Sequence, residues 1–471
     1  MTPGQRSAVV LALAGAVLGG CTLMPNFERP APAILAQFPQ GDAYAQSPDT
    51  TGLPNLVLRD IFADPALIQI IELALANNQD LKLAAANVAA VRGQYRVQRA
   101  QRFPRVDGSA SASVGERSER ASSSGNSSGD ATAYQAGIGI TTFELDFFGR
   151  VSSLSEAALQ EYFATAAAER TTRIALIAEI ANIYLGMAAN RSLLAIAEDT
   201  VRAANRSVEL TRARLKGGVA PRSDVRQAET VMEQAQADLA ELTTIVAQNR
   251  NALRLLVGAD VTTIEEPQSI ETLTGKLTEV PAGLDSALLL NRPDVLQAEH
   301  QLRASNARIG AARAAFFPRI SLTAAAGLAS TSLSSLFTAG AFAWSVQPAL
   351  LIPIFDAGAN DANLEASLAL REAATARYQK SIQTAFREVA DALARRGTIE
   401  RQFDAQTRLV DAATDNLTLV EARYRQGIDS FLGTLDAQRT LYAARRTLVQ
   451  TWLVRAQNVV SLYRALGQPA E

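Results

Sequence analysis

The sequence predicts a mainly α-helical chain with a small β portion, built as two copies of one unit. The stretch Arg423–Arg439 has a cruder counterpart 209 residues earlier, beginning at Arg214, and the same offset pairs Gly427 with Gly218. The segments Gly149–Lys216 and Gly358–Gln426 both keep a helical pattern and contain no proline. This repeat favours one elongated two-repeat protein over the two or three domains that 471 residues could otherwise form.

Composition excludes several function classes. The formal net charge of −2 gives no nucleic-acid footprint, and one Cys with one His cannot build a disulfide framework or a His/Cys metal cluster. No phosphate loop or nucleophile elbow is present, so we expect neither an enzyme nor a cofactor. His300 lies in a charged helical stretch and is expected at the surface. Glu144 and Asp146 alternate along a predicted strand and are expected to line the end of a barrel, although they could also form a carboxylate pair.

The N-terminus has the layout of a secretory signal. One positive charge precedes the apolar run Ala8–Leu18, which is too short to span a membrane. The run ends in Leu-Gly-Gly-Cys21, which resembles a bacterial lipobox. Residues 1–20 are therefore predicted to be removed, leaving a covalent lipid on Cys21. The alternative is an ordinary signal peptide with an incidental free thiol.

The structure of each remaining segment is predicted from the spacing of its apolar residues and from its prolines. Prolines make residues 21–60 an extended strap, and a helix begins near Asp64-Pro65 and is stopped by Phe103-Pro104. Alternating residues then predict two strands joined by the polar loop Ser122–Asp130. The predicted order is helix 61–104, strand hairpin 105–147, helical hairpin 148–258 and linker or collar 259–282, followed by helix 283–318, strand hairpin 319–355, helical hairpin 356–467 and tail 468–471.

The last helix carries a seven-residue ladder, which is typical of a coiled-coil seam. At 1.5 Å per residue, each long proline-free segment would reach roughly 100 Å if it is one continuous helix. The ladder residues are Leu435, Tyr442, Val449, Ala456 and Tyr463.

The strands decide how the chain could cross a membrane. No stretch after residue 20 is expected to be apolar over the length of a membrane helix. A spanning structure must then be a closed barrel, and about eight strands is the smallest workable number. Four strands per chain therefore predict an oligomer, with about eight strands from two copies or twelve from three. The alternative is a small soluble sheet that caps the helices.

The order of motifs resembles that of the TolC/OprM-like outer-membrane factors. The chain looks closest to the lipoprotein branch that serves resistance–nodulation–division (RND) efflux pumps. No single motif is specific, but the ordered set covers about residues 17–467. The set comprises Asp64-Pro65, Ala76–Leu81, Phe103-Pro104, Glu144–Arg150, Asn291–Asp294, Pro353–Gly358 and the Tyr424-Arg425-Gln426-Gly427 and Leu435–Arg439 tip.

The resemblance implies a homotrimer with a 12-stranded barrel among the lipids of the outer membrane and an α-helical periplasmic tube. Such a protein is the passive exit duct for small molecules, working with a periplasmic adaptor and an inner-membrane RND transporter. Two alternatives stay open. The duct could serve ABC-type protein secretion, or the chain could be a lipid-anchored periplasmic coiled-coil or adaptor protein.

The resemblance also assigns a gate at the helical tips. The matching residues are Leu432, Asp436 and Arg439, whose spacing places them on one helix face. They are called the gate residues below. Arg214, Arg222 and Asp224 of the first tip match contacts that hold the tip shut. The alternative for Asp436 and Arg439 is a solvated i,i+3 ion pair on a helix surface.

Overall fold

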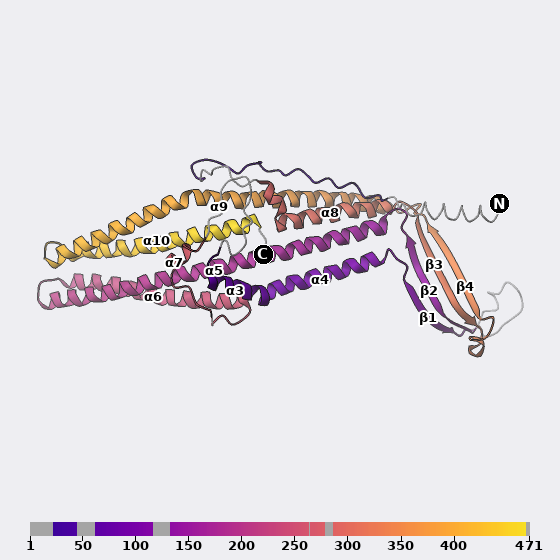
Figure 1. The fold of residues 1–471 in the computed structure, drawn as a ribbon, viewed down its shortest axis with the longest axis horizontal. Helices are drawn as coiled ribbons and strands as arrows, with labels where there is room; N and C mark the ends of the chain where they lie inside the picture. The colour runs from indigo at the N-terminus through magenta and orange to yellow at the C-terminus, as the bar shows by residue number, and fades with distance from the viewer. Residues whose placement is uncertain (1–21, 45–61, 116–131, 263, 278–285, 468–471) are drawn as a thin grey trace. The chain divides into compact units, whose positions relative to one another are not determined.

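The computed structural model describes residues 22–44, 62–115, 132–262, 264–277 and 286–467 (Figure 1). It divides into two compact units. The sheet unit comprises Met1–Ala31, Asn87–Thr165 and Gln297–Tyr378. The helical unit comprises Pro32–Ala86, Ala166–Leu296 and Gln379–Glu471.

The sheet unit contains one antiparallel sheet with its strands in chain order. The strands are β1 (Val106–Ser113), β2 (Ala133–Leu145), β3 (Arg319–Ser330) and β4 (Phe342–Leu351). All four strands predicted from alternation are confirmed. The predicted polar loop Ser122–Asp130 lies outside the described residues.

The register gives this sheet one apolar and one polar face. Directly paired residues of an antiparallel sheet share a face, so the pairs Ile138↔Ala326 and Ala326↔Trp344 join three strands into one apolar stripe. A bulge between Ile140 and Phe143 inserts a residue, and this keeps Phe143 on the stripe opposite Leu322. Paired polar residues such as Thr323 and Gln347 fill the other face. Strand β4 and the bulge add the aromatic side chains of Phe342, Trp344 and Phe143 to the apolar face.

The long helices confirm the repeat. The first pair is α5 (Arg150–Lys216) and α6 (Arg222–Val257), and the second is α9 (Ala359–Arg425) and α10 (Phe431–Leu466). Every bound of the second pair lies 209 residues after its counterpart, and α5 and α9 are each continuous over 67 residues. The shorter helices α4 (Gln79–Ala100) and α8 (Pro293–Ala314) also match each other, with 22 residues each.

The first predicted helix is interrupted, which corrects the expectation of one continuous pattern. The structure has α3 (Pro65–Asn77) and α4 on either side of Asn78, whose ψ is 133°. The buried Asn78 side chain accepts a hydrogen bond from Leu81 N at 2.8 Å and donates one to Leu256 O at 2.7 Å. This asparagine caps α4 and ties the break to α6. The predicted linker also contains a short helix, α7 (Ile270–Thr274).

Helix α5 corrects a second expectation. In the described part of the chain it is long and apolar enough, over one 18-residue window, to pass for a membrane span by composition. However, 61% of that window is buried inside the protein. Burial of this kind is typical of a helix in a protein core, which explains the apolar composition.

The predicted strap is extended over residues 22–44 and docks on helices in both units. In the sheet unit, Asn306 Nδ2 donates to Pro25 O at 2.8 Å, and Arg29 pairs with the buried Glu299 at 2.8 Å. Gly310 is required here, because a Cβ would lie 2.8 Å from Met24 Cα. In the helical unit, the rings of Phe38 and Phe386 stack at 4.9 Å, and Ser286 Oγ donates to Ala36 O.

Candidate functional site

The two helical hairpins of the helical unit end in turns of the same construction, drawn at the same end of α5/α6 and α9/α10 in Figure 1. Gly218 and Gly427 have φ of +74° and +76°, a region that favours glycine. Val219 N donates to Arg214 O, and Ile428 N donates to Arg423 O, each at 3.0 Å. These are the bonds of a helix ending in a left-handed glycine, which explains why the glycine recurs at the repeat offset.

A small apolar cluster joins the two hairpins directly behind the turns. Its buried members come from all four long helices, and the Tyr424 and Phe431 rings lie 5.3 Å apart. Val231 and Met232 pack against it. The cluster holds α10 in a defined rotation, because it fixes which face of the helix is buried. Its members are Val208, Ala228, Tyr424, Phe431 and Leu435.

The gate residues lie on the exposed face of α10. Leu432 is 59% exposed, and Asp436 and Arg439 are also exposed, whereas the neighbouring Leu435 is buried. Among the described residues, the Asp436 and Arg439 side chains form no hydrogen bond or ion pair with each other or with any other group. Three chemically different side chains are therefore presented together to whatever lies beside this face.

The three residues predicted to form tip contacts, Arg214, Arg222 and Asp224, have different surroundings from one another. The Arg214 guanidinium lies over the Tyr424 ring, 4.7 Å from its centroid, and so bridges the first hairpin to the second. Burial raises the pKa of Tyr424, opposed by the charge of Arg214 and reinforced by that of Asp224. Asp224 Oδ1 accepts a hydrogen bond from Ser223 Oγ at 3.4 Å. Arg222 is exposed and, in the described part of the chain, has no side-chain partner.

A buried polar group above the tip was missed by sequence reasoning. Asp238 of α6 is 7% exposed, and its Oδ2 accepts from Tyr442 Oη at 2.6 Å and from Arg446 Nη1 at 3.0 Å, both on α10. Gln234 donates to Oδ1 from within α6 at 2.9 Å. The sequence did contain a signal for this buried group. Asp238 lies seven residues after Val231 and seven before Ile245, so a charged residue occupies a position where the spacing predicts an apolar one.

The turn itself carries an ion pair that was also missed. Arg423 Nε and Nη2 donate to the two carboxylate oxygens of Asp429 at 2.6 and 3.0 Å. Both side chains are partly exposed, at 55% and 32%. This bidentate pair spans the second turn, six residues apart, and orients the loop between α9 and α10.

The remaining candidate residues fall outside the tips. Cys21 lies outside the described residues. His300 is partly exposed, as expected of a surface residue, but it also lies 2.7 Å from Gln160 Oε1 and beside the Phe163 ring. Asp146 follows β2 instead of lying on it, and its carboxylate accepts from Val151 N and Ser152 N at the start of α5. It is a helix cap, while Glu144 pairs with Arg150.

Comparison with known proteins gives consistent matches over most of the chain. The family model described as "Outer membrane efflux protein" matches residues 70–259 and 284–468. The solvent efflux pump outer membrane protein SrpC of Pseudomonas putida is 46% identical over 96% of both chains. Among solved structures, a membrane protein from Pseudomonas aeruginosa is similar with 38% identity and a TM-score of 0.88, covering 95% of this chain and 97% of that one. The open state of the Neisseria gonorrhoeae MtrE outer membrane channel has 33% identity and a TM-score of 0.84, covering 96% and 99%.

Proposed function

Because this chain belongs to the outer membrane efflux protein family, we propose that it is the exit channel of a tripartite efflux system, conducting small molecules passively out of the cell. It is an outer membrane protein that extends into the periplasm, and it is not an enzyme. One observation carries the proposal. A single chain combines a two-faced sheet that has open edges with two matched helical hairpins, the second of which exposes the gate residues on α10.

The open sheet edges support a trimeric barrel. Strands β1 and β4 are the two edges of the four-stranded sheet, and each presents unpaired backbone groups. A bilayer tolerates no open edge, so β4 of one copy pairs with β1 of the next until the barrel closes. Three copies supply about 12 strands, a size within the known range. The exposed Phe342, Trp344 and Val346 then face lipid, and the polar face lines the lumen.

The exposed stripe on α10 supports a gate at the tips. When three copies bring Leu432 together near one axis, an apolar constriction forms that resists wetting. Three Asp436 carboxylates at close range repel one another unless cations or Arg439 guanidinium groups of neighbouring copies compensate. Exposed ion pairs contribute only about 0–1 kcal/mol each. Several such links hold the tip closed and still release when a partner binds.

The partners follow from the same surfaces. The tip turns expose Val219 (68%) and Ile428 (59%), which provides apolar area for a periplasmic adaptor to cover. The adaptor couples the channel to an inner-membrane transporter, which we propose is of the RND type. A lipid on Cys21 anchors the start of the docked strap in the outer membrane.

Single-channel conductance in planar bilayers tests the gate. Native protein is expected to show low, flickering conductance, and the Asp436→Ala/Arg439→Ala variant a sharp increase. Asp429→Asn is the matched control, because it removes a charge from the same tip but not from the gate stripe. If the double variant inserts as a stable trimer and conducts like the native protein, the gate assignment is wrong. A protein that never inserts would overturn the barrel instead.

A further inference from the structure

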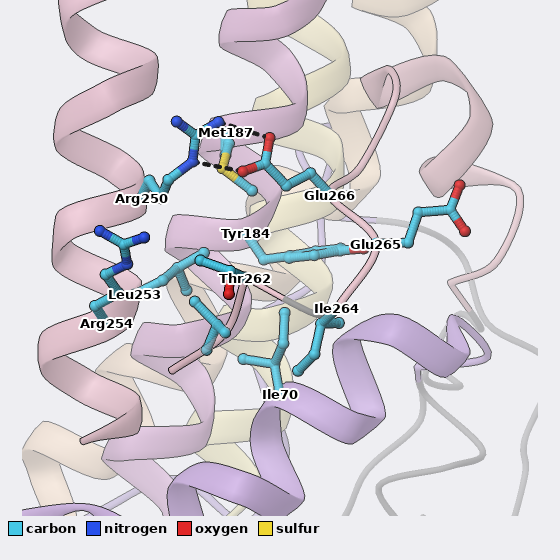
Figure 2. Close-up of a pocket in the computed structure, with 11 residues that line it drawn as sticks. Ile70, Tyr184, Met187, Arg250, Leu253, Arg254, Thr262, Ile264, Glu265 and Glu266 are labelled. Carbon is cyan, nitrogen blue, oxygen red and sulfur yellow. Dashed lines mark hydrogen bonds and ion pairs between the residues drawn. The ribbon is translucent and has the colours of Figure 1, made fainter. Parts of the chain in front are cut away.

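The helical unit contains a cavity beside the C-terminal end of α6, which is the end away from the tip turn (Figure 2). It encloses about 240 Å³ between α3, α5, α6 and the segment that follows α6. Its floor and walls are mostly apolar, with the ring of Tyr184 forming one side. The apolar lining residues are Ile70, Met187, Leu253, Val261 and Ile264.

The polar walls are held in place by contacts outside the cavity. Tyr184 Oη donates to Asp64 Oδ1 at 3.2 Å, and Asp64 Oδ2 accepts from Lys276 at 2.7 Å. Arg250 forms two hydrogen bonds to Glu266, at 2.5 and 2.9 Å, which Figure 2 draws at the upper rim. A ligand entering this cavity would not have to order these side chains, and preorganisation of this kind favours binding.

One cation at the cavity makes no direct contact with an acid. Arg254 lines the cavity one helical turn after Arg250, and its exposed side chain has no hydrogen-bond or ion-pair partner in the described part of the chain. Its charge acts on Asp260 and Glu266 only through space, where it helps to lower the pKa of both carboxyl groups. The nearby acids are already engaged. Glu266 is held by Arg250, and Asp260 accepts from Thr262 N at 3.0 Å and Thr262 Oγ1 at 2.9 Å. Figure 2 shows the Glu265 carboxylate turned away from the cavity.

We propose that this cavity binds a small carboxylate with a compact apolar body. The guanidinium of Arg254 supplies the fork of donors that matches a carboxylate, and the apolar lining takes the rest of the molecule. Ligand sites usually measure about 300–1,000 Å³, so this cavity suits one aromatic ring or a short branched chain. The site uses only residues of one compact unit and does not depend on how the channel is gated.

Isothermal titration with sodium benzoate as the probe tests the site, using the full-length purified protein in detergent. Benzyl alcohol is the neutral comparison ligand of similar shape. Arg254→Gln removes the cation, and Val261→Phe fills the apolar part. Arg222→Gln is the matched control, because it removes an exposed, unpartnered arginine elsewhere on α6. Native electrophoresis before each titration confirms that the oligomer is unchanged.

Benzoate is expected to bind wild type and Arg222→Gln alike. Because a carboxylate–guanidinium contact is lost, Arg254→Gln should weaken benzoate binding about tenfold or more. Val261→Phe should weaken benzoate and benzyl alcohol together. The proposal is overturned if benzoate does not bind wild type at millimolar concentration. Equal binding by wild type and Arg254→Gln, or equal losses in Arg222→Gln and Arg254→Gln, would overturn it as well.

Discussion

Removal of the Asp238 carboxylate should loosen the helix that carries the gate residues. Asp238 accepts hydrogen bonds from Tyr442 and Arg446, one and two turns beyond Arg439 on α10. Replacement by Asn keeps the shape of the side chain but removes its charge, and replacement by Ala removes the acceptor and both hydrogen bonds to α10. Because Asp238 is buried, solvent cannot replace these bonds without opening the contact between α6 and α10.

The size of the effect follows from the two bonds across the helix pair. A hydrogen bond to a charged group contributes about 1.5–3 kcal/mol. The two bonds share one carboxylate oxygen and are not additive, so we expect about 2–3 kcal/mol for Asp238→Ala. At about 1.4 kcal/mol per tenfold, local opening of α10 becomes roughly 30- to 150-fold more frequent.

Hydrogen–deuterium exchange of the α10 backbone amides measures this directly. Peptides covering residues 438–450 should exchange faster in Asp238→Ala by the stated factor, and in Asp238→Asn by less. Asp429→Asn breaks an exposed ion pair that solvent screens, so it should accelerate exchange much less than Asp238→Ala does. Equal acceleration in the Asp238 and Asp429 variants, or none in either Asp238 variant, would refute the reasoning.

Three further predictions concern stability. Burial raises the pKa of Asp64, but hydrogen bonds from Lys276, Leu67 N and Tyr184 and the charge of Lys276 outweigh burial, so this pKa lies below its ordinary value. Because the pKa of Asp64 is lower in the folded state, its ionised carboxylate stabilises the fold above the unfolded pKa of about 3.9, and this stabilisation is lost as the pH falls through the folded-state pKa. Lys276→Met removes the main partner of the carboxylate. The resulting decrease in Tm relative to wild type, measured by scanning calorimetry, should therefore be largest at pH 7 and shrink below about pH 4. Gly327→Ala should lower the heat resistance of the oligomer on gels, because its Cβ would clash with Ala136 O across the β2–β3 ladder. Gly108→Ala should not, because a Cβ there has no described atom within 4 Å. Asn78→Ala leaves Leu81 N without its cap and should cost about 1–3 kcal/mol, seen as a lower Tm, while the exposed Gln79→Ala should change it little.

The long periodic segments were predictable because many residues in each segment fit the same helical or alternating pattern. Sixty-seven helical residues without proline, or a dozen alternating ones, override any single unfavourable position. The features that sequence reasoning missed depend on single residues. The break at Asn78 is stabilised by a hydrogen bond to Leu256 O of α6, a helix far away in the sequence. The bulge beside Thr142 is defined by the pairing of β2 with β3, which the sequence of β2 alone does not show.

The candidate site divides in the same way. The turns were predictable, because a left-handed helix end requires Gly218 and Gly427 locally. The partners of side chains were not, because they depend on which helices meet. Arg214 was expected to form a contact that holds the tip shut, but its partner, the Tyr424 ring, was not predicted. His300 was expected at the surface, but its packing beside Phe163 was not predicted. Residue type indicated that these positions mattered, but not what they would touch.

The matched helix lengths have a consequence for how the two halves of the chain have diverged. At the repeat offset, the counterparts of Leu432, Asp436 and Arg439 are Ser223, Gln227 and Thr230. The duplicated halves therefore share the same helix lengths, but only the second half carries the apolar and charged stripe. On this face the first hairpin presents small polar side chains, while other faces of it contact the second hairpin through Arg214 and Asp238. Selection on the first hairpin should accordingly act against insertions and deletions more strongly than against changes of side chain on this face.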